Sequence, residues 1–352
     1  MTTDRRSTFR CVRIAAAAIA LGLFSSAGFA PVSAQDATPA ASPDAVACVS
    51  PGLPPGTPTP MDEMGSMEMG TPVGETEESG SPVAVEEAEE AVTGTAADEA
   101  TAATIVAAIE NYVACFNEGH ASGDPSLFVA LESANYLASQ GYANPYDRVA
   151  SEIGSPITTA TLLDIGNATV WDDGRVSADA QLLLGDHWYN NWRIFLADVD
   201  GAWLYDEEAT LPPTPDVDFV AVNGINITET TDEATGEITY AFVSFSGSWD
   251  FVATDAIIFN FTNSGVEPHE AIVAQLPEGA DPMGLIDGSV PFEDVNFIGV
   301  AVPILPDGSA DLTLLNLPVG TYTMICFFPS PDGAPHAVHG MVQEFNIVEP
   351  AE

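Results

Sequence analysis

The chain has 352 residues, with 52 Asp and Glu against 7 Lys and Arg, a formal net charge of −45 at pH 7. This excess of negative charge repels a phosphate backbone and so excludes a nucleic-acid-binding protein. A hydrophobic fraction of 46% supports folded cores, and the length predicts two or three domains.

Residues 1–34 predict a signal peptide. An arginine-rich start precedes the apolar run 14–24, and small residues follow it up to a cleavage site at 32–34. The apolar run is shorter than the roughly 20 residues that a membrane-spanning helix needs. We therefore expect no stable membrane insertion after cleavage, and a protein that is secreted or lies in the cell envelope or periplasm.

Residues 35–100 are rich in Pro, Met and Glu and contain no aromatic residue. Such a composition predicts a disordered acidic linker, because it buries too little apolar surface to offset the entropy of ordering. Half of the eight methionines cluster here, at Met61, Met64, Met67 and Met69. Thioethers bind Cu(I), so these residues are secondary metal candidates; the alternative is compositional drift.

Three cysteines remain after signal cleavage: Cys48, Cys115 and Cys326. In an oxidising compartment, a disulfide between Cys48 and Cys115 is one pairing, and it would leave Cys326 as a free thiol. The alternative is three unpaired cysteines.

Residues 101–210 predict an α+β domain. Apolar residues from Ile105 to Phe116 lie on one face of a helix that Gly119 ends, and Asp124 and Pro125 begin a second helix that carries apolar residues through Ala134. Four strands follow, at 159–171, 175–184, 187–199 and 202–207.

This element order, with the helical segment 110–119, resembles the cone-shaped fold of the nuclear-transport-factor-two and polyketide-cyclase-like superfamily. The superfamily contains enzymes and many non-catalytic members. The polar candidates here are scattered, so a structural or ligand-binding role is favoured over catalysis. They are His120, Asp164, Asp172, His187 and Arg193. A stiff Pro-rich linker at 211–215 ends the domain.

Residues 216–352 predict an all-β domain, a sandwich or a barrel. The expected strands lie at 219–222, 238–245, 256–262, 271–275, 296–302, 310–315, 321–327 and 342–348.

This domain contains the side chains that a blue-copper site requires. Such a site binds copper through two imidazoles and one thiolate, with a weak axial thioether. The sequence supplies His269 from one strand end, and Cys326, His336 and Met341 from a single loop region.

The Asn-x-Gly-x-x-x-His turn ending at His269, the Gly-x-Tyr-x-x-x-Cys strand ending at Cys326 and the Pro-His-x-x-x-Gly-Met segment resemble the cupredoxin (blue type 1 copper) family. The resemblance implies a Greek-key sandwich with a single type 1-like copper ion. It implies His269, Cys326 and His336 as strong ligands and Met341 as the axial ligand. The sequence departs from the family in the nine residues between Cys326 and His336, and His339 is an alternative to His336.

The leading hypothesis is an exported cupredoxin-like protein that transfers one electron or holds copper. Its acidic surface suits a basic redox partner. The alternative is a metal-free cupredoxin-fold binding or scaffold protein of the cell envelope. A third hypothesis, an enzyme, is disfavoured: a multicopper oxidase needs many more histidines than five, usually in His-x-His pairs, and this chain has no such pair.

Overall fold

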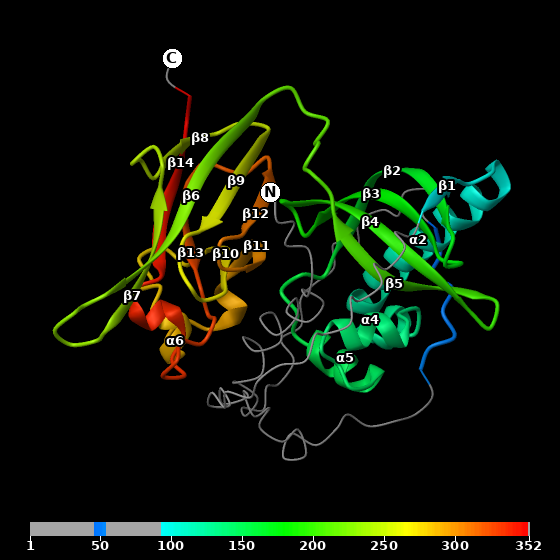
Figure 1. The fold of residues 1–352 in the computed structure, drawn as a ribbon, viewed down its shortest axis with the longest axis horizontal. Coiled ribbons are helices and arrows are strands. Elements are labelled where there is room, and N and C mark those ends of the chain that lie inside the picture. The colour runs from blue at the N-terminus through cyan, green and yellow to red at the C-terminus, as the bar shows by residue number, and fades with distance from the viewer. Residues whose placement is uncertain (1–45, 54–92, 351–352) are drawn as a thin grey trace, which may run out of the picture.

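The computed structural model describes residues 46–53 and 93–350, which form two β-rich halves lying side by side (Figure 1). The predicted signal peptide and the methionine cluster lie outside the described residues. Among the described helices, none is both long enough and apolar enough to cross a membrane.

The first half packs helices against an antiparallel meander. The resemblance to the nuclear-transport-factor-two superfamily stays a prediction. The elements are β1 (Gly94–Ala96), α2 (Glu99–Ser122), α3 (Ser126–Val129), α4 (Ala134–Ser139), α5 (Pro145–Glu152), β2 (Ala160–Trp171), β3 (Val176–Leu184), β4 (Trp188–Val199) and β5 (Ala202–Thr210).

Helix α2 runs past the glycine at which it was expected to end. It begins where the Asp98 side chain accepts a hydrogen bond from the Thr101 amide at 2.8 Å, and it ends at Gly123, whose φ is +73°. Gly119 lies inside the helix, where a Cβ would stand 3.1 Å from the Phe128 ring. This glycine therefore permits close packing of α3 rather than ending the helix.

The single second helix that the sequence predicted is divided into α3 and α4. Between them, the chain pairs with β5 through two backbone hydrogen bonds: Ser133 donates to the Tyr205 carbonyl, and Tyr205 donates to the Leu131 carbonyl, both at 2.8 Å. The Ser133 hydroxyl then caps α4 by accepting from the Tyr136 amide. A tertiary contact thus overrides the local helical pattern.

The predicted disordered segment 35–100 is corrected at residues 46–53 and 93–100. A disulfide joins Cys48 to Cys115 of α2, and Asn111 bonds both the amide and the carbonyl of Val49. β1 pairs antiparallel with β2. Cross-linking and strand pairing supply the contacts that composition did not reveal.

The second half is a β-sandwich, as predicted. One layer contains β6 (Val220–Thr231), β7 (Ile238–Ser244), β9 (Ala256–Asn263) and β12 (Ser309–Leu315). The other contains β8 (Asp250–Val252), β10 (His269–Gln275), β11 (Asn296–Ile304), β13 (Gly320–Ile325) and β14 (Val342–Val348). Short helices α6 (Gly284–Asp287), η1 (Phe292–Asp294) and η2 (His336–His339) lie in the connections.

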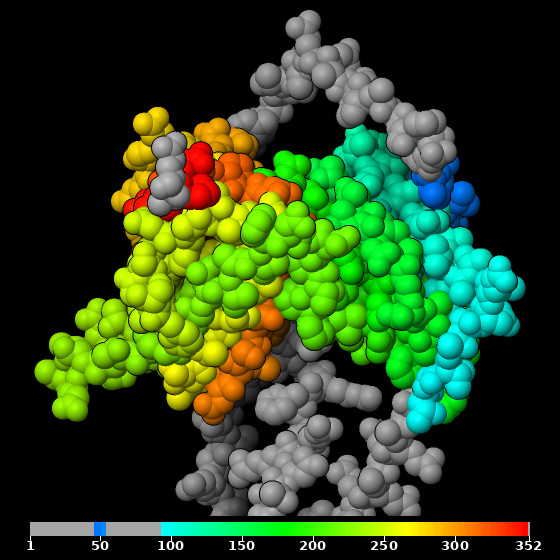
Figure 2. Space-filling model, turned by 90° about the horizontal axis from the view of Figure 1, so that it is seen from above, coloured from blue at the N-terminus to red at the C-terminus, as the bar shows by residue number. Residues whose placement is uncertain are grey.

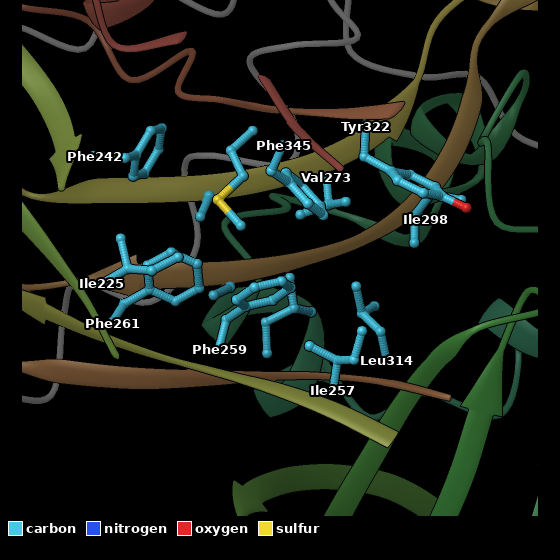
Figure 3. Packing of buried hydrophobic residues seen from close by; sticks show 14 of the residues in the cluster. Ile225, Phe242, Ile257, Phe259, Phe261, Val273, Ile298, Leu314, Tyr322 and Phe345 are labelled. Carbon is cyan, nitrogen blue, oxygen red and sulfur yellow. The ribbon is translucent and has the colours of Figure 1, made fainter. Parts of the chain in front are cut away.

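The sandwich core is rich in aromatic side chains. Phe259 and Phe345 lie 5.5 Å apart between ring centroids in an edge-to-face arrangement, with Ile225 and Val273 nearby in the same cluster (Figure 3). Apolar burial of this kind must hold the half together, since no Lys or Arg follows Arg193 in the sequence.

The two halves share one sheet. β12 of the sandwich pairs antiparallel with β4, so that the order β1-β2-β3-β4-β12-β9-β6-β7 is continuous. The halves abut in the space-filling view (Figure 2). The expected stiff linker folds back on β4, where Asn191 donates to the Pro212 carbonyl at 2.8 Å. Strand pairing and hydrogen bonds therefore join the two halves.

Candidate metal centre

Three donor side chains converge at one end of the sandwich. His269 begins β10, Cys326 directly follows β13, and His336 begins η2. One ligand atom from each lies within 4.8 Å of the others, and all three residues are buried. The two Nδ1 atoms are 2.9 Å apart, and Cys326 Sγ lies 3.5 Å from His336 Nδ1. The donors thus point at one shared position.

The long segment between Cys326 and His336 bulges outward and returns. Pro329 and Pro335 form a bridge, and Ser330 donates to the Ala334 carbonyl, which closes the excursion. At its base, the His336 amide donates to the Phe328 carbonyl at 2.8 Å. The extra residues therefore extend the loop without displacing His336 from Cys326.

The turn before His269 is built by Asn263 and Gly265 of the Asn-x-Gly-x-x-x-His segment. The side-chain nitrogen of Asn263 donates to the backbone carbonyls of Glu267 and Ile304 at 2.7 and 3.0 Å. Its side-chain oxygen accepts from the backbone amide of Gly265. A Cβ on Gly265 would lie 2.1 Å from Glu229 Oε1. A larger residue at this position would therefore displace the Glu229 carboxylate, which accepts from the Glu267 amide and lies against His269.

The two other candidate ligands, Met341 and His339, lie in different surroundings. Met341 is fully buried in the same core cluster as Cys326, and its carbonyl accepts from the Cys326 amide at 3.2 Å. His339 lies outside the convergent group, with Nε2 3.2 Å from Asp332 Oδ2. The geometry therefore favours His336 over His339.

Two carboxylates that the sequence reasoning missed bind the outer nitrogens of the histidines. Glu229 Oε1 lies 3.2 Å from His269 Nε2, and Glu267 Oε2 lies 2.9 Å from His336 Nε2. Tyr240 stacks on His336 at 4.0 Å and donates to Glu267. Such partners fix the ring orientation and raise the basicity of ligand imidazoles. The only sequence signal was that Glu267 lies two residues before His269.

Burial determines the protonation of the donors. It lowers the pKa of both His269 and His336 to about 4, so both imidazoles are neutral at pH 7 and have a free lone pair. Burial, with the neighbouring Glu270, raises the pKa of the Cys326 thiol. At neutral pH the centre therefore holds one proton that a bound metal must displace.

Copper loading at pH 7 is expected to release about one proton per ion, because Cys326 must become a thiolate while the histidines are already neutral. Potentiometric titration in weakly buffered solution measures this release. Cys326→Ser should reduce it to near zero. Release near zero from the unaltered protein would contradict the assigned ligand.

Glu267→Gln is expected to raise the copper reduction potential, since removing a negative charge beside His336 destabilises the more positive oxidised ion. Partners of this kind change metal affinity by about 10- to 100-fold. If the loss falls on the oxidised state, the shift is roughly 60–120 mV, at about 59 mV per tenfold for one electron. Spectroelectrochemistry at pH 8 measures it. The exposed Glu344→Gln is the control, and a lowered potential would contradict the argument.

The polar candidates of the first half do not form a common site. Arg193 pairs with Asp179 at 2.7 Å, and His187 Nδ1 lies 2.8 Å from the Leu315 carbonyl at the shared sheet. Asp172 bonds Thr93, and Asp164 pairs with Gln181 along β2 and β3. The side chains of Arg193, His187 and Asp172 therefore have structural partners, and Asp164 takes part in the pairing of β2 with β3.

Of the two candidate histidines of the first half, His120 has a carboxylate neighbour, whereas His187 contacts a backbone carbonyl. Its Nε2 lies 3.3 Å from Glu152 Oε2, and its ring stacks on Phe128. Glu152 also pairs with Arg148, so this contact belongs to a buried ionic cluster.

The donor set fits a type 1 copper site: two neutral imidazoles and one buried sulfur converge, with a buried methionine close in the chain. Cys326 and the histidines would hold the ion, which would supply a reversible one-electron couple. Zinc would use the same donors but has no need of a methionine.

Several solved structures resemble the chain. Auracyanin A, a "blue" copper protein from Chloroflexus aurantiacus, is 19% identical, with 37% of this chain and 100% of that chain covered at a TM-score of 0.25. Auracyanin from Roseiflexus castenholzii is 20% identical, with 36% of this chain and 98% of that chain covered at a TM-score of 0.24. A multicopper oxidase from Aquifex aeolicus is 13% identical, with 45% of this chain and 41% of that chain covered at a TM-score of 0.23. No protein-family model and no curated protein matches the sequence.

Proposed function

We propose that this protein is an exported copper protein that transfers single electrons through a centre of His269, Cys326 and His336, with Met341 as the axial ligand. The observation that carries the proposal is the convergence of the three donors from separate segments within 4.8 Å of one another. A structural cysteine and two unrelated core histidines have no reason to meet in this way.

The surroundings of the donors favour reversible electron transfer over catalysis. All three donors are buried, and carboxylates hold both imidazoles in orientation. A rigid, enclosed ligand set changes little between oxidation states and offers a substrate no open coordination position. The acidic chain would then bind a basic redox partner by charge attraction.

Copper reconstitution tests the proposal. Purified protein with stoichiometric Cu(II) is expected to show an intense visible band from thiolate-to-copper charge transfer, and this band should bleach with one electron and return on reoxidation. Protein that stays colourless and retains no copper after desalting would overturn the proposal. That result would favour the alternative, a metal-free binding or scaffold protein.

Export is tested separately, through the N-terminus of the mature chain. The arginine-rich start and the apolar run of residues 14–24 support it. Mass spectrometry of protein recovered from outside the cytoplasm is expected to find a chain that begins just after residue 34. A full-length chain that remains in the cytoplasm would contradict export.

A further inference from the structure

A cavity of about 740 Å³ lies where the two halves meet, on the outer face of the sheet whose strand β10 carries His269. Its walls come from α2, α4, α5 and β4 on one side and from β10, β11 and β13 on the other. This volume is within the range of small-molecule sites, and domain junctions are where such sites commonly occur.

Strand alternation places the cavity directly behind the metal centre. Along β10, His269, Ala271 and Val273 face the sandwich core, so that Glu270 and Ile272 face the opposite way and line the cavity. The Phe327 amide donates to Glu270 Oε1 at 2.9 Å, while the Glu270 amide donates to Cys326 Sγ at 3.5 Å.

One carboxylate oxygen of Glu270 lacks the hydrogen bond that a ligand would supply. The residue is 1% exposed, and its Oε2 accepts no hydrogen bond among the described residues. An unpartnered buried carboxylate oxygen is costly, and here it belongs to a residue that lines a cavity. It calls for a hydrogen-bond donor carried by a bound molecule.

The other residues that line the cavity indicate the shape and charge of the rest of that molecule. The walls are mainly apolar, and aromatic side chains, with Tyr136, Tyr142, Trp188 and Trp192 among them, make up about a third of the lining residues. Four glutamates line the cavity against one arginine, Arg148, which already pairs with Glu132 and Glu152. A flat apolar body suits these walls, and the excess of carboxylates favours a positive charge over a negative one.

We propose that this cavity binds an arylalkylamine, a small aromatic molecule with a primary ammonium group, whose ammonium donates to Glu270. The aromatic ring packs among the tyrosine and tryptophan side chains of the first half. The site needs no copper and lies beyond the electron-transfer function, although the Glu270 amide links it to the Cys326 sulfur.

Three isosteric indoles test the proposal by isothermal titration calorimetry on the metal-free full chain, so that copper loading does not affect the result. Tryptamine is the cation, tryptophol the neutral analogue and indole-3-acetate the anion. Tryptamine is expected to bind at least tenfold more tightly than tryptophol, and indole-3-acetate is expected not to bind. Absent tryptamine binding, or equal or tighter binding of either analogue, would overturn the proposal.

Two variants locate the binding. Glu270→Gln keeps the acceptor for Phe327 but loses the charge, and should weaken tryptamine binding by about ten- to a hundredfold. Val300→Trp fills the cavity from β11 and should abolish binding. The exposed Glu344→Gln is the matched control and should bind as the unaltered protein does. Unchanged affinity in both cavity variants would show that tryptamine binds elsewhere.

Discussion

Cys326→Ser is expected to abolish the visible charge-transfer band of the copper-loaded protein. It should also lower the copper affinity by more than the 10- to 100-fold loss that is typical when a residue that only hydrogen-bonds a ligand is mutated. The band requires a thiolate bound to the metal, and Cys326 is the only free cysteine among the described residues. A serine hydroxyl supplies neither the soft donor nor the high-lying sulfur electrons from which visible charge transfer starts. Absorption spectroscopy and competitive chelator titration measure both losses.

His339→Ala is the matched control for this experiment. His339 pairs with Asp332 on the loop and lies outside the convergent group, so its loss should leave the band and the affinity unchanged. A band that survives Cys326→Ser would contradict the assigned thiolate. A band that disappears in His339→Ala would contradict the assignment of the second imidazole to His336.

Arg148→Met is expected to destabilise the protein by about 3–5 kcal/mol, the usual cost of leaving buried ionic partners uncompensated. Arg148 Nε lies 3.4 Å from Glu132 Oε2, and its guanidinium also pairs with Glu152. The Glu132 side chain is 0% exposed, and burial raises its pKa. Chemical denaturation at pH 7 measures the loss.

The pH dependence of this variant identifies the cause. Without the arginine, the folded-state pKa of Glu132 should rise further above its unfolded value, so the folded protein binds more protons than the unfolded chain. Stability should then recover as pH falls from 7 toward 5. Arg175→Met is the control, because its partners Asp173 and Glu207 are partly exposed, and it should cost less than about 1 kcal/mol. Equal losses in the two variants would contradict the argument.

Local patterns predicted most of the strands. The alternation and turn residues placed β2, β3 and β4 within one residue at each end, and the same holds for β14. They missed the short strands β1 and β8. Each has three residues, and partners distant in sequence hold them, Thr169–Trp171 for β1 and Asn346–Val348 for β8. A strand this short has too little periodicity to detect.

By itself, the sequence predicted the donor types and their order, because the chemistry of copper restricts which side chains serve: His269, then Cys326, His336 and Met341. It also determined the sandwich, because alternating apolar residues bury one face of each strand. Only the tertiary structure decided whether the nine-residue insert returns His336, which carboxylates orient the imidazoles and how the halves join. Those outcomes depend on contacts between residues far apart in the chain, such as Glu229 with His269 and β4 with β12. Local sequence patterns do not predict such pairings, because these contacts form only when the whole chain packs.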